Sequence, residues 1–472
     1  MKEFDQFTDS NSMKQNLPQW LPWLEGNVQL TDCRSLHLHY KTYLKTGSRW
    51  KSFLAATYEL RLHNRLTDER SRQIIFAKIF LGNRSREAFE QAIRLPLTPT
   101  GFGPSLIHLD DQRMLVWAFP NDPVLHHLPD ITDPVRVKKH LPYASLPPGF
   151  AAKEISAINV KVINYRPELR CTARYNLVGK TSALTIYGKS FADDRGAEIY
   201  RRLESMWQLS QQSGGDFPMP RPLGYNDETQ TIWQEELPGQ PLAEIINRDN
   251  CAALISEAVG RLAFIHRSGA PTSARVTAEN HMEEIRKKIA KLVQAFPAVK
   301  TSLSKTAELL ERRLPKLPAA EGCVIHGDFH LRQLIVDDDQ VALFDFDEFA
   351  IGDPAQDLAN FIADLHAQPF DKDFVAAMSA KLVESYCDCA GWPADADWLN
   401  WHLAVQFITR AYRAYLQQKP NLENQTAAAA TLIECSGTTE VSVDGRTHRK
   451  GTKDQRVKES EKKRLFLSTN RL

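Results

Sequence analysis

The sequence lacks long apolar runs and lacks an excess of charge of either sign. No stretch of about 18 or more apolar residues occurs among its 472 residues, so we expect no membrane-spanning helix. The net charge is +1 with histidine neutral, which gives no reason to expect nucleic acid or an anionic membrane as the main partner. The N-terminal stretch MKEFDQFTDSNSMKQ has no apolar core of the kind found in signal peptides. We therefore expect a cytoplasmic globular protein and, at this length, two or three domains.

The cysteines follow neither a disulfide framework nor a zinc-binding pattern. Their number is odd and their spacings are scattered: they are Cys33, Cys171, Cys251, Cys323, Cys387, Cys389 and Cys435. Cys387 and Cys389 are separated by one residue, which is not the usual zinc-ribbon spacing, and no second pair follows. We expect reduced thiols in structural positions, as is usual in the cytoplasm.

Two aspartates flank a segment that has the pattern of a β-hairpin. Asp328 stands in VIHGDFH (324–330), where Gly327 permits an unusual backbone conformation. The apolar runs LIV and VALF that follow have the length and residue types of strands, and DDDQ between them has turn chemistry. A hairpin here returns the chain, so we expect Asp345, which follows the second run, to lie near Asp328. Two carboxylates brought together in this way indicate a metal site or a proton transfer.

A helix is predicted to begin shortly after this hairpin. Asp353 has the position of its N-cap, Pro354 is its first residue, and Gln356 stands three residues after the cap. Asp357 lies in the first turn, where the helix dipole favours a carboxylate. At this position Asp357 is also placed to brace the preceding loop.

The ordered pattern His-Gly-Asp-x-His-x-x-Gln, hairpin, Asp-Phe, then Gly-Asp-Pro-x-x-Asp resembles the signature of the aminoglycoside phosphotransferase and choline kinase-like family. That family shares its fold with protein kinases, so the resemblance implies an α+β, bilobal protein kinase-like fold. It implies that Asp328 is the catalytic base, which orients or deprotonates the substrate hydroxyl. It also implies that Asp345 and Gln333 bind Mg²⁺, with Gln333 where the family usually has Asn. Taken singly, each aspartate fits a turn or cap residue, and we expect His326 and His330 to organise or pack the loop.

These implied roles agree with the chemistry of phosphoryl transfer. The reaction needs its nucleophile in line and the charge of the phosphates neutralised. Mg²⁺ prefers a few protein oxygen ligands together with phosphates and water. The amide oxygen of Gln333 is one methylene further from the backbone than that of an asparagine, which leaves Asp345 as the main expected ligand.

The resemblance also implies an ATP-binding lobe upstream of this motif. Lys189 ends an apolar run in TSALTIYGKSF, and Glu198 follows nine residues later in a helix-like stretch. Lys189 would hold the α- and β-phosphates and Glu198 would hold Lys189; the alternative is an ordinary surface lysine and helix glutamate. The hinge is expected in TIWQEELPGQPL, where backbone groups around Glu235, Glu236 and Leu237 would meet the adenine edge.

A glycine-rich phosphate loop is absent from this lobe. The corresponding turn, in INYRPELRCTARYNL (163–177), is built on Pro167 and charged residues. Related small-molecule kinases often lack these glycines as well. Arg166 and Arg170 either reach phosphate or are solvated turn residues.

Three amphipathic segments downstream predict helices of a mainly helical catalytic lobe. The first, LISEAVGRLAFIHRSGAP, carries His266, which we interpret as a core-edge histidine. The second is HMEEIRKKIAKLVQAF. The third, WLNWHLAVQFITRAYRAYL, carries Trp398 and Trp401, which either line a sugar pocket or pack in the core.

The first 150 residues contain a faint copy of the nucleotide lobe, in which lysine and glutamate are again nine residues apart. The paired positions are Lys78 with Lys189, Glu87 with Glu198, and Trp117 with Trp233. No His-Gly-Asp follows the first copy, so we interpret it as a structural cap rather than a second active site. The layout resembles that of maltokinase-like sugar kinases, which have an N-terminal cap, and this favours a sugar as substrate.

These segments predict four parts of the chain. The Pro-rich stretch 133–155 is the expected linker between the two lobe copies. After about residue 425 the sequence is polar and charged and has no apolar period. The predicted parts are an N-terminal cap at 1–150, a nucleotide-binding lobe at 151–238, a catalytic lobe at 239–425 and a disordered tail at 426–472.

The predicted function is that of an ATP- and Mg²⁺-dependent phosphotransferase acting on a hydroxyl group of a small molecule, such as a sugar, an aminoglycoside or an amino alcohol. One alternative is a catalytically weak pseudokinase or regulatory nucleotide-binding module, which the missing glycines, Gln333 and the duplicated lobe permit. Another is a protein kinase, but the Gly-Asp-Pro-x-x-Asp segment follows Asp345 too closely for a long activation loop. No acidic cluster marks an aminoglycoside site, and the sequence gives no indication of a protein partner.

Overall fold

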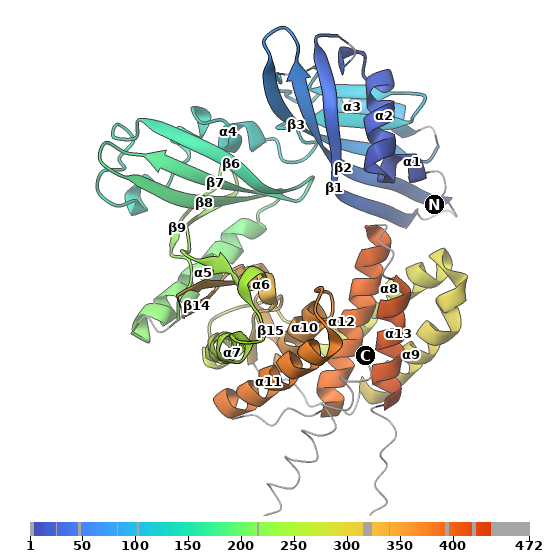
Figure 1. Ribbon diagram of the computed structural model, residues 1–472, viewed down its shortest axis with the longest axis vertical. Coiled ribbons are helices and arrows are strands. Elements are labelled where there is room, and N and C mark those ends of the chain that lie inside the picture. Colours follow the sequence, from blue (N-terminus) through green and yellow to red (C-terminus); the bar gives the residue numbers. More distant parts are fainter. Residues whose placement is uncertain are drawn as a thin grey trace, which may run out of the picture. The chain divides into compact units, whose positions relative to one another are not determined.

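Figure 1 shows the computed structural model of the protein. The chain divides into two compact units: the first is formed by residues 1–200, 222–236 and 415–419, and the second by residues 201–221, 237–414 and 420–472. The structure describes residues 4–24, 26–45, 49–82, 84–101, 103–214, 217–314, 323–338, 340–391, 396–417 and 422–435. Among these described residues, no helix is long and apolar enough to cross a membrane.

The first unit contains a five-stranded antiparallel sheet in the order β1-β2-β3-β5-β4. Its strands are β1 (Val28–Lys45), β2 (Arg49–Asn64), β3 (Glu69–Phe80), β4 (Leu106–Leu109) and β5 (Met114–Ala118). Helices α1 (Asp5–Thr8) and α2 (Ser10–Trp20) cover one face of this sheet (Figure 1), where Met13 and Leu17 are buried against strand residues such as Leu60. The apolar stripe of α2 and the inward face of the strands thus form one core.

A second five-stranded antiparallel sheet in the same unit repeats this order, as β6-β7-β8-β10-β9. Its strands are β6 (Ala157–Arg166), β7 (Arg170–Val178), β8 (Ala183–Phe191), β9 (Pro222–Asn226) and β10 (Thr231–Glu235). In each sheet a helix follows the third strand: α3 (Arg84–Ala92) follows β3, and α5 (Arg195–Gln212) follows β8. The two sheets therefore share one topology, which agrees with a duplicated lobe.

The strand register shows that the two tryptophans of the predicted repeat are not equivalent. Trp117 stands two residues beyond the residue opposite Lys78, whereas Trp233 stands one residue beyond the residue opposite Lys189. Because side chains alternate between the faces of a sheet, Trp117 shares the face of Lys78. Trp233 lies on the opposite face from Lys189 and packs on Tyr175, with 4.9 Å between ring centroids. The predicted pairing of the tryptophans is therefore wrong by one residue.

The Pro-rich segment 133–155, predicted to be a linker, also forms a covering layer on the second sheet. It contains the short 3-10 turns η3 (Arg136–Lys139) and η4 (Tyr143–Ser145). Its buried residues Val137 and Leu141 belong to the same apolar cluster as Trp233. A sheet with one apolar face must bury that face, and this segment does so.

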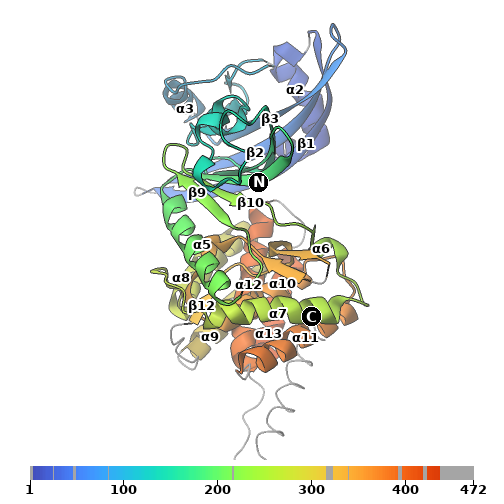
Figure 2. The same cartoon turned by 90° about the vertical axis from the view of Figure 1, so that its left-hand side faces the viewer.

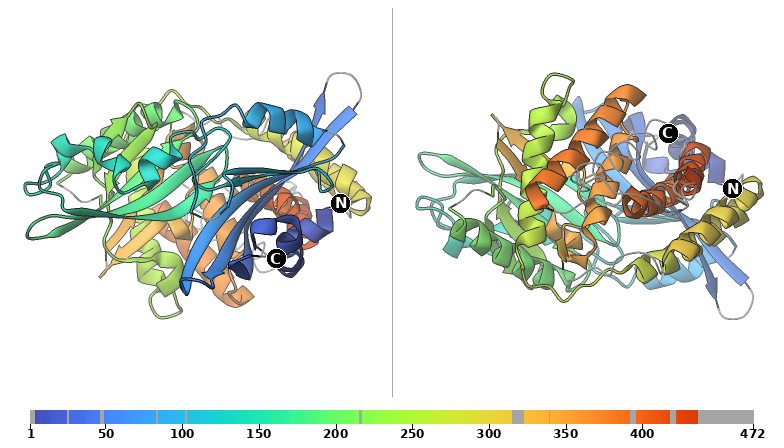
Figure 3. Two further views of the ribbon diagram at one scale, coloured as in Figure 1. Left: turned by 90° about the horizontal axis from the view of Figure 1, so that it is seen from above. Right: turned by 90° about the horizontal axis from the view of Figure 1, so that it is seen from below.

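The second unit is mainly helical (Figure 2). Its helices are α6 (Leu242–Ile245), α7 (Cys251–Arg267), α8 (Ala278–Ala295), α9 (Lys300–Arg313), α10 (Pro354–Leu365), α11 (Lys372–Ala390), α12 (Ala396–Leu416) and α13 (Leu422–Cys435). Its short strands are β11 (Gln240–Pro241), β12 (Cys323–Ile325), β13 (Leu334–Asp337), β14 (Gln340–Leu343) and β15 (Ala350–Gly352). Helices α7 and α11 lie side by side (Figure 3), and α7, α8 and α12 are the three helices that the amphipathic segments predict.

The predicted tail begins later than the sequence pattern indicates. Residues 426–435 belong to α13, which packs against α9, and Ala429 is fully buried. The run of four alanines in this helix favours helix formation because alanine has the highest helix propensity. The predicted boundary at residue 426 is corrected accordingly, and residues 436–472 lie outside the described residues.

Trp401 packs in the core and does not line a sugar pocket. Its side chain is fully buried, and its indole N–H donates a hydrogen bond to the carbonyl oxygen of Leu310 at 3.1 Å. A buried indole whose only donor is satisfied by the backbone has no polar group left for a ligand. This contact decides between the two interpretations of Trp401.

Candidate active site

The loop that carries Asp328 passes through a conformation that suits glycine alone. The loop follows β12, which ends at Ile325, and Gly327 has a φ of +81°. A Cβ atom at position 327 would stand 2.3 Å from the carbonyl oxygen of Glu348. Any larger residue would therefore collide with the backbone as well as adopt a strained φ. The unusual backbone conformation expected at Gly327 is confirmed.

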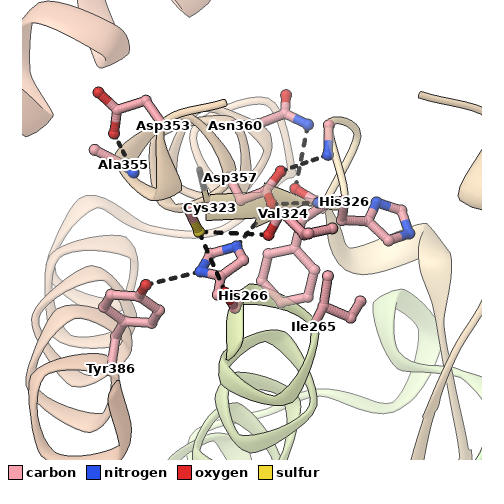
Figure 4. A network of polar contacts seen from close by, with 12 residues as sticks. Ile265, His266, Cys323, Val324, His326, Asp353, Ala355, Asp357, Asn360 and Tyr386 are labelled. Atoms are coloured by element: carbon pink, nitrogen blue, oxygen red, sulfur yellow. Dashed lines mark hydrogen bonds and ion pairs between the residues drawn. The ribbon is translucent and has the colours of Figure 1, made fainter. Parts of the chain in front are cut away.

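Asp357, in the first turn of α10, braces this loop (Figure 4). Its Oδ2 accepts a hydrogen bond from the N–H of His326 at 2.7 Å, and its Oδ1 accepts one from the N–H of Gly327 at 2.8 Å. The carboxylate is fully buried, and its charge is stabilised by these two N–H groups and by the N-terminus of α10. Asp353 caps the same helix by accepting a hydrogen bond from the N–H of Ala355 at 2.9 Å. The brace expected at Asp357 is present.

Behind Asp357 lies a buried histidine whose role the sequence pattern did not reveal (Figure 4). His266, in α7, has Nε2 at 3.0 Å from Oδ2 of Asp357 and Nδ1 at 2.7 Å from the hydroxyl oxygen of Tyr386 in α11. When Nε2–H donates to the carboxylate, Nδ1 is left to accept from the tyrosine hydroxyl. Burial raises the pKa of Tyr386, so this hydroxyl keeps its proton at neutral pH.

We interpreted His266 as a core-edge histidine, but it also supports the carboxylate of Asp357, which holds the loop of Asp328. Its partners are 91 and 120 residues away in the sequence, so no local pattern marks it. A histidine in the last turn of an amphipathic helix is the only signal that the sequence offers. The adjacent thiol of Cys323 is a structural neighbour, and burial raises its pKa to about 12.

Asp328 is positioned by contacts at both of its carboxylate oxygens. The amide Nδ2 of Asn360 donates to Oδ1 of Asp328 at 3.3 Å and to the carbonyl oxygen of Phe329 at 3.2 Å. His330 Nε2 lies 3.5 Å from Oδ2 of Asp328. The side chain of Asp328 is 32% exposed, whereas that of Asp357 is fully buried. Asn360, one helical turn after Asp357, is a site residue that the sequence pattern did not single out.

Asp328 is a carboxylate at neutral pH. Burial pushes its pKa upward, but the hydrogen bond and charge of His330 and the charges of His326 and Arg413 outweigh this effect. The pKa of Asp328 consequently lies below its usual value. An ionised, partly exposed carboxylate that is held by its neighbours can accept a hydrogen bond from a hydroxyl group.

The hairpin brings the two predicted metal ligands together. Gln333 directly precedes β13, Asp345 follows β14, and the strands pair with Leu334 opposite Leu343. In the resulting geometry Nε2 of Gln333 donates a hydrogen bond to Oδ2 of Asp345 at 3.1 Å. His326 Nε2 lies 3.1 Å from the carbonyl oxygen of the residue that precedes Asp345, and this contact links the hairpin to the loop of Asp328.

The donor set at this pair fits magnesium. An amide presents either its nitrogen or its oxygen to a neighbour, so a half-turn of the Gln333 side chain would place an oxygen beside the carboxylate of Asp345. Among the residues that the structure describes, no group of three or more His, Cys, Asp or Glu could hold a metal. Mg²⁺ usually binds one or two carboxylates together with phosphates and water, so one carboxylate and one amide suffice on the protein side.

The predicted phosphate-binding pair lies in the first unit. Lys189 stands near the end of β8, with its Nζ 5.7 Å from the ring centroid of Phe191. Glu198 lies in the first turn of α5, the helix that follows β8. The resemblance implies this arrangement for phosphate binding, with a lysine on a strand and a glutamate at the start of the next helix.

The predicted hinge begins where the first unit ends. Glu235 is the last residue of β10, and the second unit resumes at Leu237. The carboxylate of Glu236 accepts hydrogen bonds from Nε of Arg174 at 2.8 Å and from the hydroxyl of Tyr187 at 3.3 Å. This side chain is thus bound to the sheet, and the contact of the backbone here with adenine stays a prediction.

Residues 189–398 match the model of the phosphotransferase enzyme family. A comparison with curated proteins gives no match. Similar solved structures include a thermostable mutant of the aminoglycoside phosphotransferase APH(4)-Ia, with 13% identity over 60% of this chain and 97% of that chain and a TM-score of 0.45. They also include a choline/ethanolamine kinase family protein from Mesorhizobium loti, with 10% identity over 72% and 99% of the two chains and a TM-score of 0.45. A choline kinase from Cryptosporidium parvum Iowa II has 14% identity over 64% and 94% and a TM-score of 0.46.

The matched segment is a little under half of the chain and contains every predicted site residue. The family match and the sheet and helix order assign to the chain an α+β, bilobal protein kinase-like fold with an additional lobe-like region at its N-terminus.

Proposed function

We propose that this protein is an ATP- and Mg²⁺-dependent phosphotransferase that transfers the terminal phosphoryl group of ATP to a hydroxyl group of a small molecule. Sugars, aminoglycosides and amino alcohols are the acceptor classes to be tested. The observation that carries the proposal is the braced loop that presents Asp328 as an ionised, partly exposed carboxylate. A carboxylate in this state can orient an acceptor hydroxyl and take its proton.

The roles of the other residues follow from their chemistry. Asp345 and Gln333 would hold Mg²⁺, which neutralises charge on the phosphates when it is bound. Lys189 would hold the α- and β-phosphates, and Glu198 would keep the lysine in place. Asn360 and Asp357 act on the loop: the first orients the carboxylate of Asp328, and the second fixes the backbone.

A small-molecule acceptor is favoured over a protein by the segment that follows Asp345. Only the 3-10 turn η8 (Phe346–Glu348), Phe349 and strand β15 separate Asp345 from the N-cap of α10. β15 pairs with β12 along its whole length, from Ala350 to Gly352. A segment this short and this firmly paired has no long activation loop for a protein substrate.

The alternative is a catalytically weak pseudokinase or a regulatory nucleotide-binding module. A pseudokinase has no need of an ionised base held by an amide, yet Asn360 holds Asp328 in this way. The pairing of Gln333 with Asp345 likewise keeps a potential metal-binding carboxylate in place. Both features favour a working phosphotransferase.

The first experiment is a thermal-shift titration with ATP, with and without Mg²⁺, on the wild type and on Asp345→Ala. We expect stabilisation that requires both the metal and Asp345. Asp338→Asn is the matched control, because Asp338 lies exposed in the same hairpin with a φ of +51°, which asparagine also tolerates. Stabilisation that is equal in all variants, or absent from the wild type, would remove the nucleotide site from the proposal.

The second experiment measures phosphorylation of a panel of sugars, aminoglycosides and amino alcohols by the wild type and by Asp328→Asn. The substitution keeps an oxygen that accepts the hydrogen bond from Asn360 but removes the base. We expect kcat to fall by about 10²–10⁴-fold with ATP binding retained. Loss of ATP binding together with unfolding would instead make Asp328 a structural residue.

A further inference from the structure

Lys78, the counterpart of Lys189 in the first sheet, lies among aromatic rings. Its Nζ is 5.6 Å from the ring centroid of Phe53, 5.9 Å from that of Phe76 and 5.7 Å from that of Trp117. Each distance is within the range of a cation–π contact. The three rings are buried and belong to the apolar core on this face of the sheet. Aromatic rings therefore surround the ammonium of Lys78. It lies on the face of the sheet that would bind phosphates in a nucleotide lobe.

The ammonium of Lys78 pairs with a carboxylate that comes from the second sheet. Lys78 Nζ donates a hydrogen bond to Oε1 of Glu168, which lies in the turn between β6 and β7. Both side chains are only 16% exposed, so the pair is shielded from water and from salt. Glu168 has a φ of +62°, which is uncommon for a residue other than glycine.

A second anchor holds the backbone of the same turn. Oδ2 of Asp122, in the segment after β5, accepts hydrogen bonds from the hydroxyl of Tyr165 at 2.6 Å and from the N–H of Glu168 at 3.0 Å. Its Oδ1 accepts from the N–H groups of Val124 and Leu125, both at 2.8 Å, and the side chain is buried. The N-terminal region thus holds Glu168 by its side chain through Lys78 and by its backbone through Asp122.

The position of this turn in the second sheet indicates what the contacts of Lys78 and Asp122 with Glu168 do. It joins the first two strands of the second sheet, where a kinase-like lobe carries the loop that covers the nucleotide phosphates. That loop is usually rich in glycine, but this turn reads Arg166-Pro167-Glu168-Leu169-Arg170 and contains none. A turn that is already held in place loses less conformational freedom when a ligand binds.

We propose that the N-terminal lobe-like region fixes the phosphate-covering turn of the nucleotide lobe, with Lys78 and Asp122 as positioning residues that act through Glu168. This inference rests on the proposed nucleotide site. On this proposal Lys78 does not bind a nucleotide at a second site. It holds Glu168 of the second sheet instead.

The test combines Lys78→Met, Glu168→Gln and the double variant, all in the full-length chain. Methionine keeps the apolar contact with the three rings and removes the charge. For each single variant we expect about a tenfold rise in the Kd and KM for MgATP with kcat little changed. The double variant should be no worse than either single variant, because the two residues act as one pair. Lys180→Met is the matched control, since Lys180 is an exposed turn residue of the same sheet.

A second readout is independent of nucleotide. Hydrogen exchange of residues 163–177 in the ligand-free protein should be faster in Lys78→Met and Glu168→Gln and unchanged in Lys180→Met. If the wild type bound no ATP, the proposed function would fail, yet faster exchange would still support the contact. Should Lys78→Met fail to fold, Glu168→Gln carries the test, because its backbone N–H remains held by Asp122. Unchanged exchange together with unchanged ATP affinity in Glu168→Gln overturns the proposal.

Discussion

Asp357→Asn is the substitution that most directly tests how the loop of Asp328 is held. The carboxylate of Asp357 accepts from the N–H groups of His326 and Gly327 and lies 3.0 Å from Nε2 of His266. Asparagine has nearly the same shape, but only one of its two terminal atoms accepts hydrogen bonds. One buried backbone N–H must then face an NH₂ group, and the remaining bonds lose the help of a full charge.

The size of the expected loss in stability follows from these contacts. A hydrogen bond to a charged group contributes about 1.5–3 kcal/mol, and a buried donor left without a partner costs about 1–3 kcal/mol. We therefore expect Asp357→Asn to lower the free energy of unfolding of the helical unit by about 3–5 kcal/mol. Since the free energy of unfolding of a whole domain is about 5–15 kcal/mol, the variant should still fold at 25 °C.

The assay is urea denaturation followed by circular dichroism, together with kcat for the best acceptor. A loop that shifts by about 1 Å misplaces Asp328 and should lower kcat by about 10²-fold. The control is Asp373→Asn, since Asp373 is an exposed carboxylate in the first turn of α11 and its loss should cost less than about 0.5 kcal/mol. A change of less than about 0.5 kcal/mol in Asp357→Asn, with kcat unaltered, would refute this account of the loop.

Three further predictions follow from the same site. Tyr386→Phe removes the hydroxyl that contacts Nδ1 of His266 and should lower the free energy of unfolding by about 1–2 kcal/mol in urea denaturation; no change would mean that water replaces the hydroxyl. Gly327→Ala should abolish activity and destabilise more than Gly391→Ala, which has a similar φ of +69° but nothing within 4 Å of the added Cβ, so equal losses would refute the predicted clash with the backbone. The pKa of Asp328 is lowered, so its carboxylate should lose its charge only at a pH below the ordinary range of an aspartate. His330→Gln removes a group that lowers this pKa, so the acid limb of the kcat/KM profile should move to higher pH, and an unmoved limb would contradict the role of His330.

Several features of the site were predictable because they are encoded locally. The glycine at position 327, the N-cap at Asp353 and the carboxylate at Asp357 each follow from residues within a few positions of one another. The hairpin that joins Gln333 to Asp345 is also local, since strand length and turn residues set its register. The family motif lies in this stretch, so the fold and the enzyme class could be read from it.

Other features were not predictable because distant segments create them. His266 gains its role only when α7, α10 and α11 pack together and bring Asp357 and Tyr386 to its two nitrogens. Asn360 contacts Asp328 only because α10 packs against the loop of Asp328. In the repeat, the pairing of tryptophans by type was wrong because side chains alternate between faces, and a shift of one residue changes the face.

The sequence by itself therefore determined the enzyme class, the hairpin that joins Gln333 to Asp345 and the presence of a second lobe-like segment. Only the tertiary structure decided what that segment does with its lysine. Lys78 and Lys189 stand at corresponding points of two similar sheets, but the partner of Lys78 is Glu168 of the other sheet. The reason is physical: local conformation depends on near neighbours along the chain, whereas the partner of a buried charge depends on which surfaces meet when the sheets pack.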